Sequence, residues 1–477
     1  MFKTIWNWIV DWINKMLGKQ NIKQALNVDI AINSDMADKL ELWTEIYENN
    51  APWVSFNVNG KKKPNDVYSL GLGMGISGEI ARTVTIEMKA EVTGSARADF
   101  LNEQLARVVE KMRHQTEFGC AKGGLIMKPY VDGDKIPIDF VQADEFYPVS
   151  FDSDGDITAA VFIDRKKIKN HWYSRLEYHS MTDEGCEIVN KAYKSSTESD
   201  LGNEVPLTSV DAWADILPEA TIRNIERPLF AYFRFPKANN IDPDSPLGVS
   251  CYSGAEDLIR QADYQWSRLL WEMEAGEFAL YVDEAALRVD SDGKFELPNK
   301  RLHRATPSGN PIGEGKLYQE WAPTLREQSL LNGLDAILRR VEFQCGLAYG
   351  TLSNPQTVDK TATELKIAKQ RSAATITDTQ KALEKALNVL LYAMDVWATL
   401  GNLSPRGAYE ASFEWDDSIV VDADTQRQQD MQEQSRGIMS KLEYRMRNHG
   451  ETKDQAREML KLVDEEREPM FEIPGEE

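Results

Sequence analysis

Apolar residues recur every three or four positions in six segments of the chain, and this spacing predicts helices with one buried face. The segments are residues 1–19, 33–49, 99–118, 253–276, 325–345 and 361–400. The last segment opens on Thr361-Ala362-Thr363-Glu364, which fits a capping box, and Gly401 and Pro405 follow its end. At 1.5 Å per residue this helix would be ~60 Å long, which predicts an extended structure that one small domain cannot bury.

A different pattern, short runs of β-branched and aromatic residues separated by turn residues, predicts antiparallel strands between residues 123 and 246. The predicted strands are residues 125–131, 136–141, 157–163, 173–179, 187–193 and 228–235. Asp132-Gly133 and Asp154-Gly155 predict tight turns, and the polar stretch at residues 195–208 predicts a loop. Together with the helices before it, this pattern predicts an α+β fold for residues 33–246.

The second half of the chain is predicted to be mainly helical, with short interruptions. Two strand-like pieces, residues 278–282 and 316–321, lie between the helices at 253–276 and 325–345. Residues 346–360, with Gly350 and Asn354-Pro355, predict a loop. The remaining elements are a strand at residues 413–421 and two helices within 425–463, broken near 448–450.

The helix at residues 253–276 has a predicted apolar face and two tryptophans whose role the pattern leaves open. The predicted face consists of Leu258, Ala262, Trp266, Leu269, Leu270 and Met273. Trp266 and Trp271 lie among many charged residues. Either they belong to an ordinary amphipathic face, or they mark a subunit interface, where aromatic residues are enriched.

Charge narrows the classes of protein that fit. The 477 residues predict about two to four domains. A net charge of −22 argues against a protein that grips phosphate backbones over its whole surface, because such binding needs a dense Lys and Arg footprint. The same charge is compatible with a protein past which DNA slides, since repulsion prevents sticking.

Cysteine and histidine positions predict no metal site. Cys120, Cys186, Cys251 and Cys345 are widely spaced, which predicts free thiols in a reducing compartment. The closest histidines, His171 and His179, have no Cys or further His at ligand spacing.

The amphipathic segment at residues 1–19 is too short and too polar for a transmembrane helix. We expect it to dock on its own domain or on a neighbouring subunit. Binding to a membrane surface is the alternative, and no membrane association is predicted.

Two motifs that could carry chemistry are better explained by local structure. Gly73-x-Gly75-x-x-Gly78 matches a dinucleotide-binding pattern but lacks a preceding buried strand, so a flexible loop is the favoured interpretation. The acidic run at residues 152–156 lacks the Gly and Glu of a calcium loop and predicts a hairpin turn. The chain has no GxxxxGK[ST], GxSxG or HExxH motif. We therefore expect a structural or binding role, no cofactor and no enzyme activity.

The order of these segments resembles the portal proteins of long-tailed phages that infect Gram-positive bacteria, from about residue 33 to residue 466. The stretches that carry the resemblance are short, and their order matters more than any one of them. They are residues 43–47 with Pro52-Trp53, 118–124, 245–250, 360–364, 415–419 and 437–440.

The resemblance implies a portal architecture: an α+β wing, paired stem helices, a β-rich clip, a long wing helix and a helical crown. The implied parts are an N-terminal helix and arm (1–32), wing (33–246), first stem helix (247–277), clip (278–324), second stem helix (325–346), tunnel loop (347–360), long wing helix with return strand (361–424), crown (425–463) and acidic tail (464–477).

The resemblance also implies a function and partners. Such proteins form rings of about twelve subunits by a head-to-tail contact whose rotation closes. The ring occupies one capsid vertex, passes double-stranded DNA without sequence specificity, and docks the terminase packaging motor and later the head-completion adaptor. Major capsid and scaffolding proteins are further implied partners, and assembly takes place in the host cytoplasm. The alternative is a scaffold or adaptor component of the virion without a channel.

Five residues near the implied tunnel loop are the candidates for contact with DNA in a channel. They are Lys360, Arg339, Arg340, Asn354 and Gln356. The alternative for the two arginines is an ion pair with carboxylates of the neighbouring subunit.

Overall fold

The computed structural model describes residues 22–55, 66–197, 200–283, 287–289, 295–296, 303–306, 318–354, 362–415 and 423–465. The chain divides into two compact units, Met1–Trp415 and Asp416–Glu477, and each is described by itself. The predicted helix at residues 1–19 and the acidic tail beyond residue 465 lie outside the described residues.

Three helices precede the main sheets: α2 (Ser34–Tyr47), α3 (Leu72–Thr85) and α4 (Ala96–Lys122). Asn33 caps α2 by accepting a 2.8 Å hydrogen bond from the Met36 N–H, and the Ser95 hydroxyl caps α4. The flexible loop predicted at Gly73–Gly78 is wrong, because these glycines belong to α3. A Cβ at Gly73 would lie 2.7 Å from Ile46 Cγ2, so this glycine permits the close approach of α3 to α2.

Among the described residues the largest sheet is antiparallel and has six strands, in the order β4-β5-β6-β7-β8 with β9 paired to β7. Its strands are β4 (Phe146–Phe151), β5 (Ile157–Ile168), β6 (His171–Thr182), β7 (Gly185–Ser195), β8 (Asn203–Val205) and β9 (Glu219–Arg223). The predicted hairpins are confirmed. β8 corrects the predicted loop at residues 195–208, since its backbone pairs with Ala192–Lys194 of β7.

Two smaller sheets complete this half of the unit. β2 (Gly124–Pro129) lies between β3 (Ile138–Gln142) and β10 (Ala231–Arg234). β1 (Lys89–Thr93) pairs with β16 (Glu410–Glu414), although more than 300 residues separate them. The α+β class predicted for this region is confirmed.

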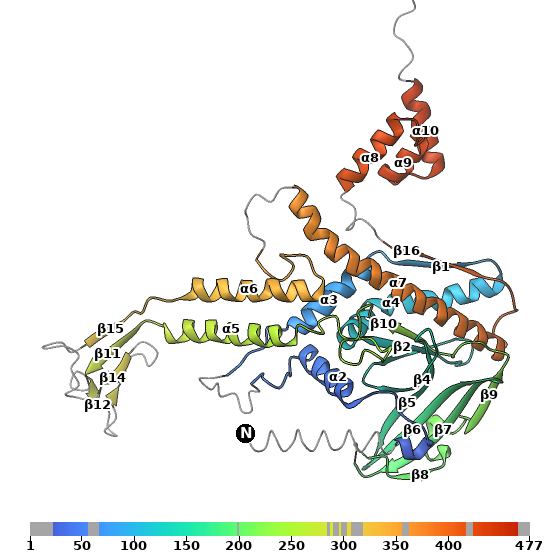
Figure 1. Cartoon of the computed structure of the whole chain (residues 1–477), viewed down its shortest axis with the longest axis horizontal. Coiled ribbons are helices and arrows are strands. Elements are labelled where there is room, and N and C mark those ends of the chain that lie inside the picture. The colour runs from blue at the N-terminus through green and yellow to red at the C-terminus, as the bar shows by residue number, and fades with distance from the viewer. Residues whose placement is uncertain are drawn as a thin grey trace, which may run out of the picture. The chain divides into compact units, whose positions relative to one another are not determined.

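Two helices, α5 (Glu256–Ala275) and α6 (Glu327–Cys345), lie side by side and are joined at one end by small sheets (Figure 1). The first sheet has the order β14-β11-β15, and the second is the β12–β13 pair. The strands are β11 (Ala279–Asp283), β12 (Arg288–Val289), β13 (Phe295–Glu296), β14 (His303–Thr306) and β15 (Tyr318–Trp321). We call this sheet-bearing end of α5–α6 the distal end, and the end at Glu256 and Cys345 the root.

The predicted apolar face of α5 is partly wrong. Met273 is 47% exposed, whereas Asp263 is 1% exposed. Asp263 is buried because Trp53 and Leu70 lie against α5, where the Trp53 indole and the Leu70 N–H each donate a 2.8 Å hydrogen bond to its carboxylate. Residues outside the helix therefore turn a polar position into a buried one.

The long helix is confirmed as α7 (Ala362–Leu400), which has 39 residues. Its later turns bury Leu383, Leu387, Leu390, Leu391 and Met394 in the same core as α2–α6. Thr361 of the predicted capping box lies outside the described residues.

The C-terminal unit contains three helices in its described part, where the sequence predicted two. They are α8 (Ala423–Ser435), α9 (Lys441–His449) and α10 (Lys453–Glu465). The break near residues 448–450 is confirmed. The additional break arises because Gly437 adopts a φ of 74° and the Ser440 hydroxyl caps α9.

Candidate functional site

The candidate site is the root of α6, where the chain leaves this helix on its way to α7. Gly346 ends α6 with a φ of 71°, and a Cβ there would overlap the Thr375 hydroxyl. That hydroxyl donates a 3.0 Å hydrogen bond to the Gly346 carbonyl. The loop therefore starts in direct contact with α7.

Glu342, in the last turn of α6, holds the following loop. Its side chain receives four hydrogen bonds from described residues and is 0% exposed. Oε1 accepts from the N–H groups of Gly350 (3.1 Å), Leu352 (2.6 Å) and Ser353 (2.8 Å), and Oε2 accepts from the Ser353 hydroxyl (2.9 Å). These donors compensate the loss of water around a buried carboxylate.

Asp335, two turns earlier on α6, joins two of the candidate channel residues. Its Oδ1 accepts a 2.7 Å hydrogen bond from the Asn354 N–H, and its Oδ2 lies 3.0 Å from Arg339 Nε. The structure thus brings Arg339 and Asn354 to one carboxylate. Arg339 pairs with Asp335 within its own helix, and the alternative of an ion pair with a neighbouring subunit's carboxylate stays a prediction.

The other candidate channel residues differ in exposure and in whether the structure describes them. Arg340 is exposed on α6, and the described residues form no ion pair with it. Gln356 and Lys360 lie outside the described residues, so their role as channel residues stays a prediction.

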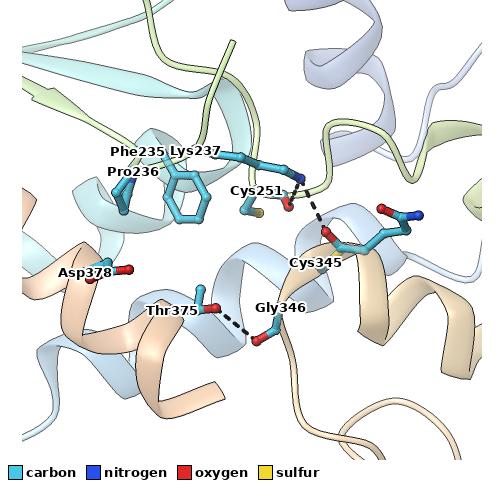
Figure 2. Close-up of a pocket in the computed structure, with 9 residues that line it drawn as sticks. Phe235, Pro236, Lys237, Cys251, Cys345, Gly346, Thr375 and Asp378 are labelled. Carbon is cyan, nitrogen blue, oxygen red and sulfur yellow. Dashed lines mark hydrogen bonds between the residues drawn. The ribbon is translucent and has the colours of Figure 1, made fainter. Parts of the chain in front are cut away.

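Lys237 connects the root of α6 to the core. Its ammonium group donates hydrogen bonds to the carbonyls of Cys251 (3.3 Å), Ser253 (2.5 Å) and Gln344 (3.3 Å). Figure 2 shows this side chain beside a small pocket lined by Cys251, Cys345, Gly346 and Thr375. Because the Gln344 carbonyl belongs to the C-terminal end of α6, a positive charge there is favourable.

The thiols near this pocket are not activated. All four cysteines of the chain are buried and free. Burial raises the pKa of Cys345 to about 12 and raises the pKa of Cys251 well above its usual range. Both groups stay protonated near neutral pH, so neither is a ready nucleophile or metal ligand. No group of three or more His, Cys, Asp or Glu side chains within the described ranges could hold a metal ion.

Sequence reasoning missed Glu342, Lys237 and Arg371. The Arg371 guanidinium on α7 lies 3.7 Å from the centre of the Phe343 ring, which adds a contact between α6 and α7. One sequence feature pointed to Glu342: an acidic residue in the last turn of a helix opposes the helix dipole, so it needs a partner. No comparable feature marks Lys237 or Arg371.

The distal end of α5–α6 exposes large apolar side chains. They are Trp271, Met273, Phe278, Tyr318, Trp321 and Leu325, which we call the distal apolar set. Between α5 and α6, the Glu272 carboxylate accepts hydrogen bonds from the Arg326 N–H, Nε and Nη2 at 2.7–3.1 Å. This pairing with Arg326 lowers the pKa of Glu272 below its usual range.

The two tryptophans of α5 differ in exposure. Trp266 packs against the core, and Trp271 is 50% exposed. The amphipathic-face interpretation therefore fits Trp266, whereas Trp271 has the exposure that an interface residue needs.

None of the helices among the described residues is both long and apolar enough to cross a bilayer.

The chain matches one family of known proteins and is similar to two solved structures. The family model described as "Phage portal protein, SPP1 Gp6-like" matches residues 105–470. The chain is also similar to two solved structures, the neck of a native GTA particle with C12 symmetry and the neck of an empty GTA particle with C6 symmetry. The first is 12% identical, with a TM-score of 0.40, over 83% of this chain and 94% of that chain. The second is 10% identical, with a TM-score of 0.42, over 87% and 94%. Comparison with the curated proteins finds no match.

Proposed function

This chain belongs to the SPP1 Gp6-like family of phage portal proteins, and from that premise we propose that it forms a ring at one capsid vertex through which double-stranded DNA enters and leaves. Membership of the family makes it a virion component with a portal or connector role. That this chain forms a ring with a channel, and that the ring docks partner proteins, is what we propose beyond family membership.

The single observation that carries the proposal is the contrast along α5–α6. Most apolar side chains at the root are buried in the chain's own core, with Phe343, which lies against Arg371 and is 41% exposed, as an exception, while every member of the distal apolar set is exposed. Monomeric soluble proteins rarely leave many large apolar side chains exposed together, so a partner surface is needed. A head-to-tail ring, proposed here with about twelve copies, supplies that surface from the next copy.

In this proposal α5 and α6 are the stem helices, and the sheets of β11–β15 form the clip. The wing comprises residues 33–246 with α7 and β16, and residues 425–463 form the crown. The clip receives the head-completion adaptor and docks the terminase motor, and capsid and scaffolding proteins contact the outer parts. We assign the chain no catalytic step, since motor proteins would drive the DNA.

The charge of the chain suits passage of DNA. A net charge of −22 disfavours tight non-specific binding to phosphates. Local cationic groups on α6, Arg339 and Arg340, and on the loop, Lys360, would then provide weak contacts with the moving duplex. Asn354 and Gln356 would add neutral polar contacts.

The proposal is tested by native mass spectrometry and electron microscopy of the purified full chain at micromolar concentration. We expect a closed ring with a central hole. A persistent monomer at that concentration would contradict the proposal, and a compact oligomer without a hole would favour a scaffold or adaptor role.

The DNA contacts need a separate measurement. Lys360→Ala, supplied to a phage whose own portal gene is inactive, is expected to change the length of packaged DNA. Unchanged packaging would remove Lys360 from the channel.

A further inference from the structure

We propose that Glu342 is a positioning residue, whose buried carboxylate holds residues 350–353 against α6 and thereby places Asn354 beside Arg339 for contact with DNA. This inference rests on the proposed function for the identity of the ligand, which is the phosphate backbone of the duplex. The anchor itself rests on geometry alone.

The Glu342 carboxylate accepts an unusual number of hydrogen bonds from the loop. Three backbone N–H groups and one hydroxyl converge on a side chain that is 0% exposed. A short loop offers few such donors. Here three of the four residues at 350–353, namely Gly350, Leu352 and Ser353, donate to this carboxylate. Removing the carboxylate would leave the Leu352 and Ser353 N–H groups without a described partner, while the Gly350 N–H would keep only its 3.2 Å hydrogen bond to the Ser353 hydroxyl oxygen, and this weakens the hold on the loop.

The segment that Glu342 anchors leads directly to Asn354, one of the candidate channel residues. Ser353, held by Glu342, is followed by Asn354, whose N–H is bonded to Asp335 Oδ1. Arg339 Nε lies 3.0 Å from the other oxygen of the same carboxylate. Glu342 therefore fixes the backbone that carries Asn354 beside Arg339, although it contacts neither side chain.

The loop is also held at its first residue, Gly346. Gly346 and Thr375 fix the point where the chain leaves α6, and Lys237 donates a hydrogen bond to the Gln344 carbonyl near the end of that helix. With both Gly346 and Ser353 fixed, the described part of the loop has one path along α6. Loss of the Glu342 contacts would release only the second of these points.

The test compares three variants. Glu342→Ala removes all four bonds to the carboxylate. Ser353→Ala removes one of these four, together with the hydrogen bond that the Ser353 hydroxyl oxygen accepts from the Gly350 N–H. Glu342→Gln is the matched control, because its carbonyl oxygen can accept the three N–H groups and its amide can donate to the Ser353 hydroxyl.

Hydrogen exchange of the purified chain, followed on the peptide that covers residues 347–354, tests the anchor. We expect Glu342→Ala to speed exchange there by about tenfold or more, Ser353→Ala to have a smaller effect, and Glu342→Gln to stay near wild type. Exchange at the wild-type rate in Glu342→Ala would refute the anchor. This measurement stands whether or not the chain forms rings, so it is independent of the proposed function.

Packaging tests the positioning role. Each variant is supplied to a phage without a working portal gene, and the fraction of assembled heads that contain DNA is measured alongside the number of heads. We expect Glu342→Ala to lower the DNA-containing fraction with the number of heads unchanged, and Glu342→Gln to restore it. Normal filling by Glu342→Ala, or failure of Glu342→Gln to restore filling, would overturn the role.

Discussion

The two ends of the α5–α6 pair differ in what covers their side chains. At the root, Val341 and Glu342 are 0% exposed, and Asp263 is enclosed by residues of another part of the chain. At the distal end Trp271 and Tyr318 are 50% and 60% exposed, and every residue of β15 is open to solvent. The two helices are continuous between these ends.

This difference separates the contacts that a single copy of the chain makes within itself from the side chains that we expect a partner to cover. Buried polar groups at the root have their hydrogen bonds in the single copy, so this end folds by itself. The distal end holds its helices together with an ion pair and leaves its apolar side chains open. We therefore expect substitutions at the root to act on folding and substitutions at the distal end to act on assembly.

The largest effect is expected from a charge placed in the root. Val341→Asp puts a carboxylate among apolar neighbours and should lower the free energy of unfolding by about 4 kcal/mol or more. Leu331→Asp is the matched control on the same helix, because Leu331 is 40% exposed and should cost less than about 1 kcal/mol. Urea unfolding followed by circular dichroism measures both, and equal midpoints would remove the contrast.

A smaller loss is expected where the root depends on a buried carboxylate. Asp263→Ala leaves the Trp53 indole and the Leu70 N–H without a partner, which should cost about 2–3 kcal/mol. Asp257→Ala, at an exposed position of the same helix, should cost no more than about 1 kcal/mol. Thermal unfolding compares the two, and a stable Asp263→Ala would show that Trp53 and Leu70 are held by other contacts.

At the distal end the effect should move from folding to assembly. Trp271→Ala combined with Trp321→Ala should leave the unfolding midpoint of the single chain unchanged. The concentration at which rings form should rise about tenfold or more, since buried aromatic residues contribute strongly to interfaces. Mass photometry over a dilution series measures this concentration. Ring formation at the wild-type concentration would mean that the distal apolar set faces away from the partner.

The smallest effect concerns the ion pair between Glu272 and Arg326. The pKa of Glu272 is lowered from its ordinary value of 4.5, so its charged form favours the folded state. That contribution is present above pH 4.5 and is lost as the pH falls through the folded-state pKa. We expect Glu272→Gln to unfold at a slightly lower temperature than wild type at pH 7, and the difference to shrink below pH 4.5. A difference that grows on acidification would contradict the assignment.

Much of the fold could be predicted because it depends on local patterns. The period of apolar residues predicted α5, α6 and α7, and the turn residues Asp132-Gly133 predicted the turn between β2 and β3. The pairing of β1 with β16 could not be predicted, because no local pattern connects strands so far apart in the chain. Gly73 shows the converse: a glycine that suggests a loop can instead permit two helices to pack closely.

The candidate site was only partly predictable. The loop after α6 followed from Gly350 and Asn354-Pro355, and Arg339 and Asn354 do meet at one carboxylate. Glu342 holds the loop through backbone N–H groups 8 to 11 residues later in the chain, and Lys237 holds the end of α6 through the Gln344 carbonyl, 107 residues away. Such bonds depend on the final path of the chain, so residue type and spacing alone do not indicate them.

The most direct test of the central claim is an electron microscopy reconstruction of the purified full chain. The account predicts a closed ring in which α5 and α6 surround the hole and the distal apolar set is buried against the next copy. A ring that leaves Trp271, Tyr318 and Trp321 exposed, or a chain that stays monomeric at micromolar concentration, would contradict it.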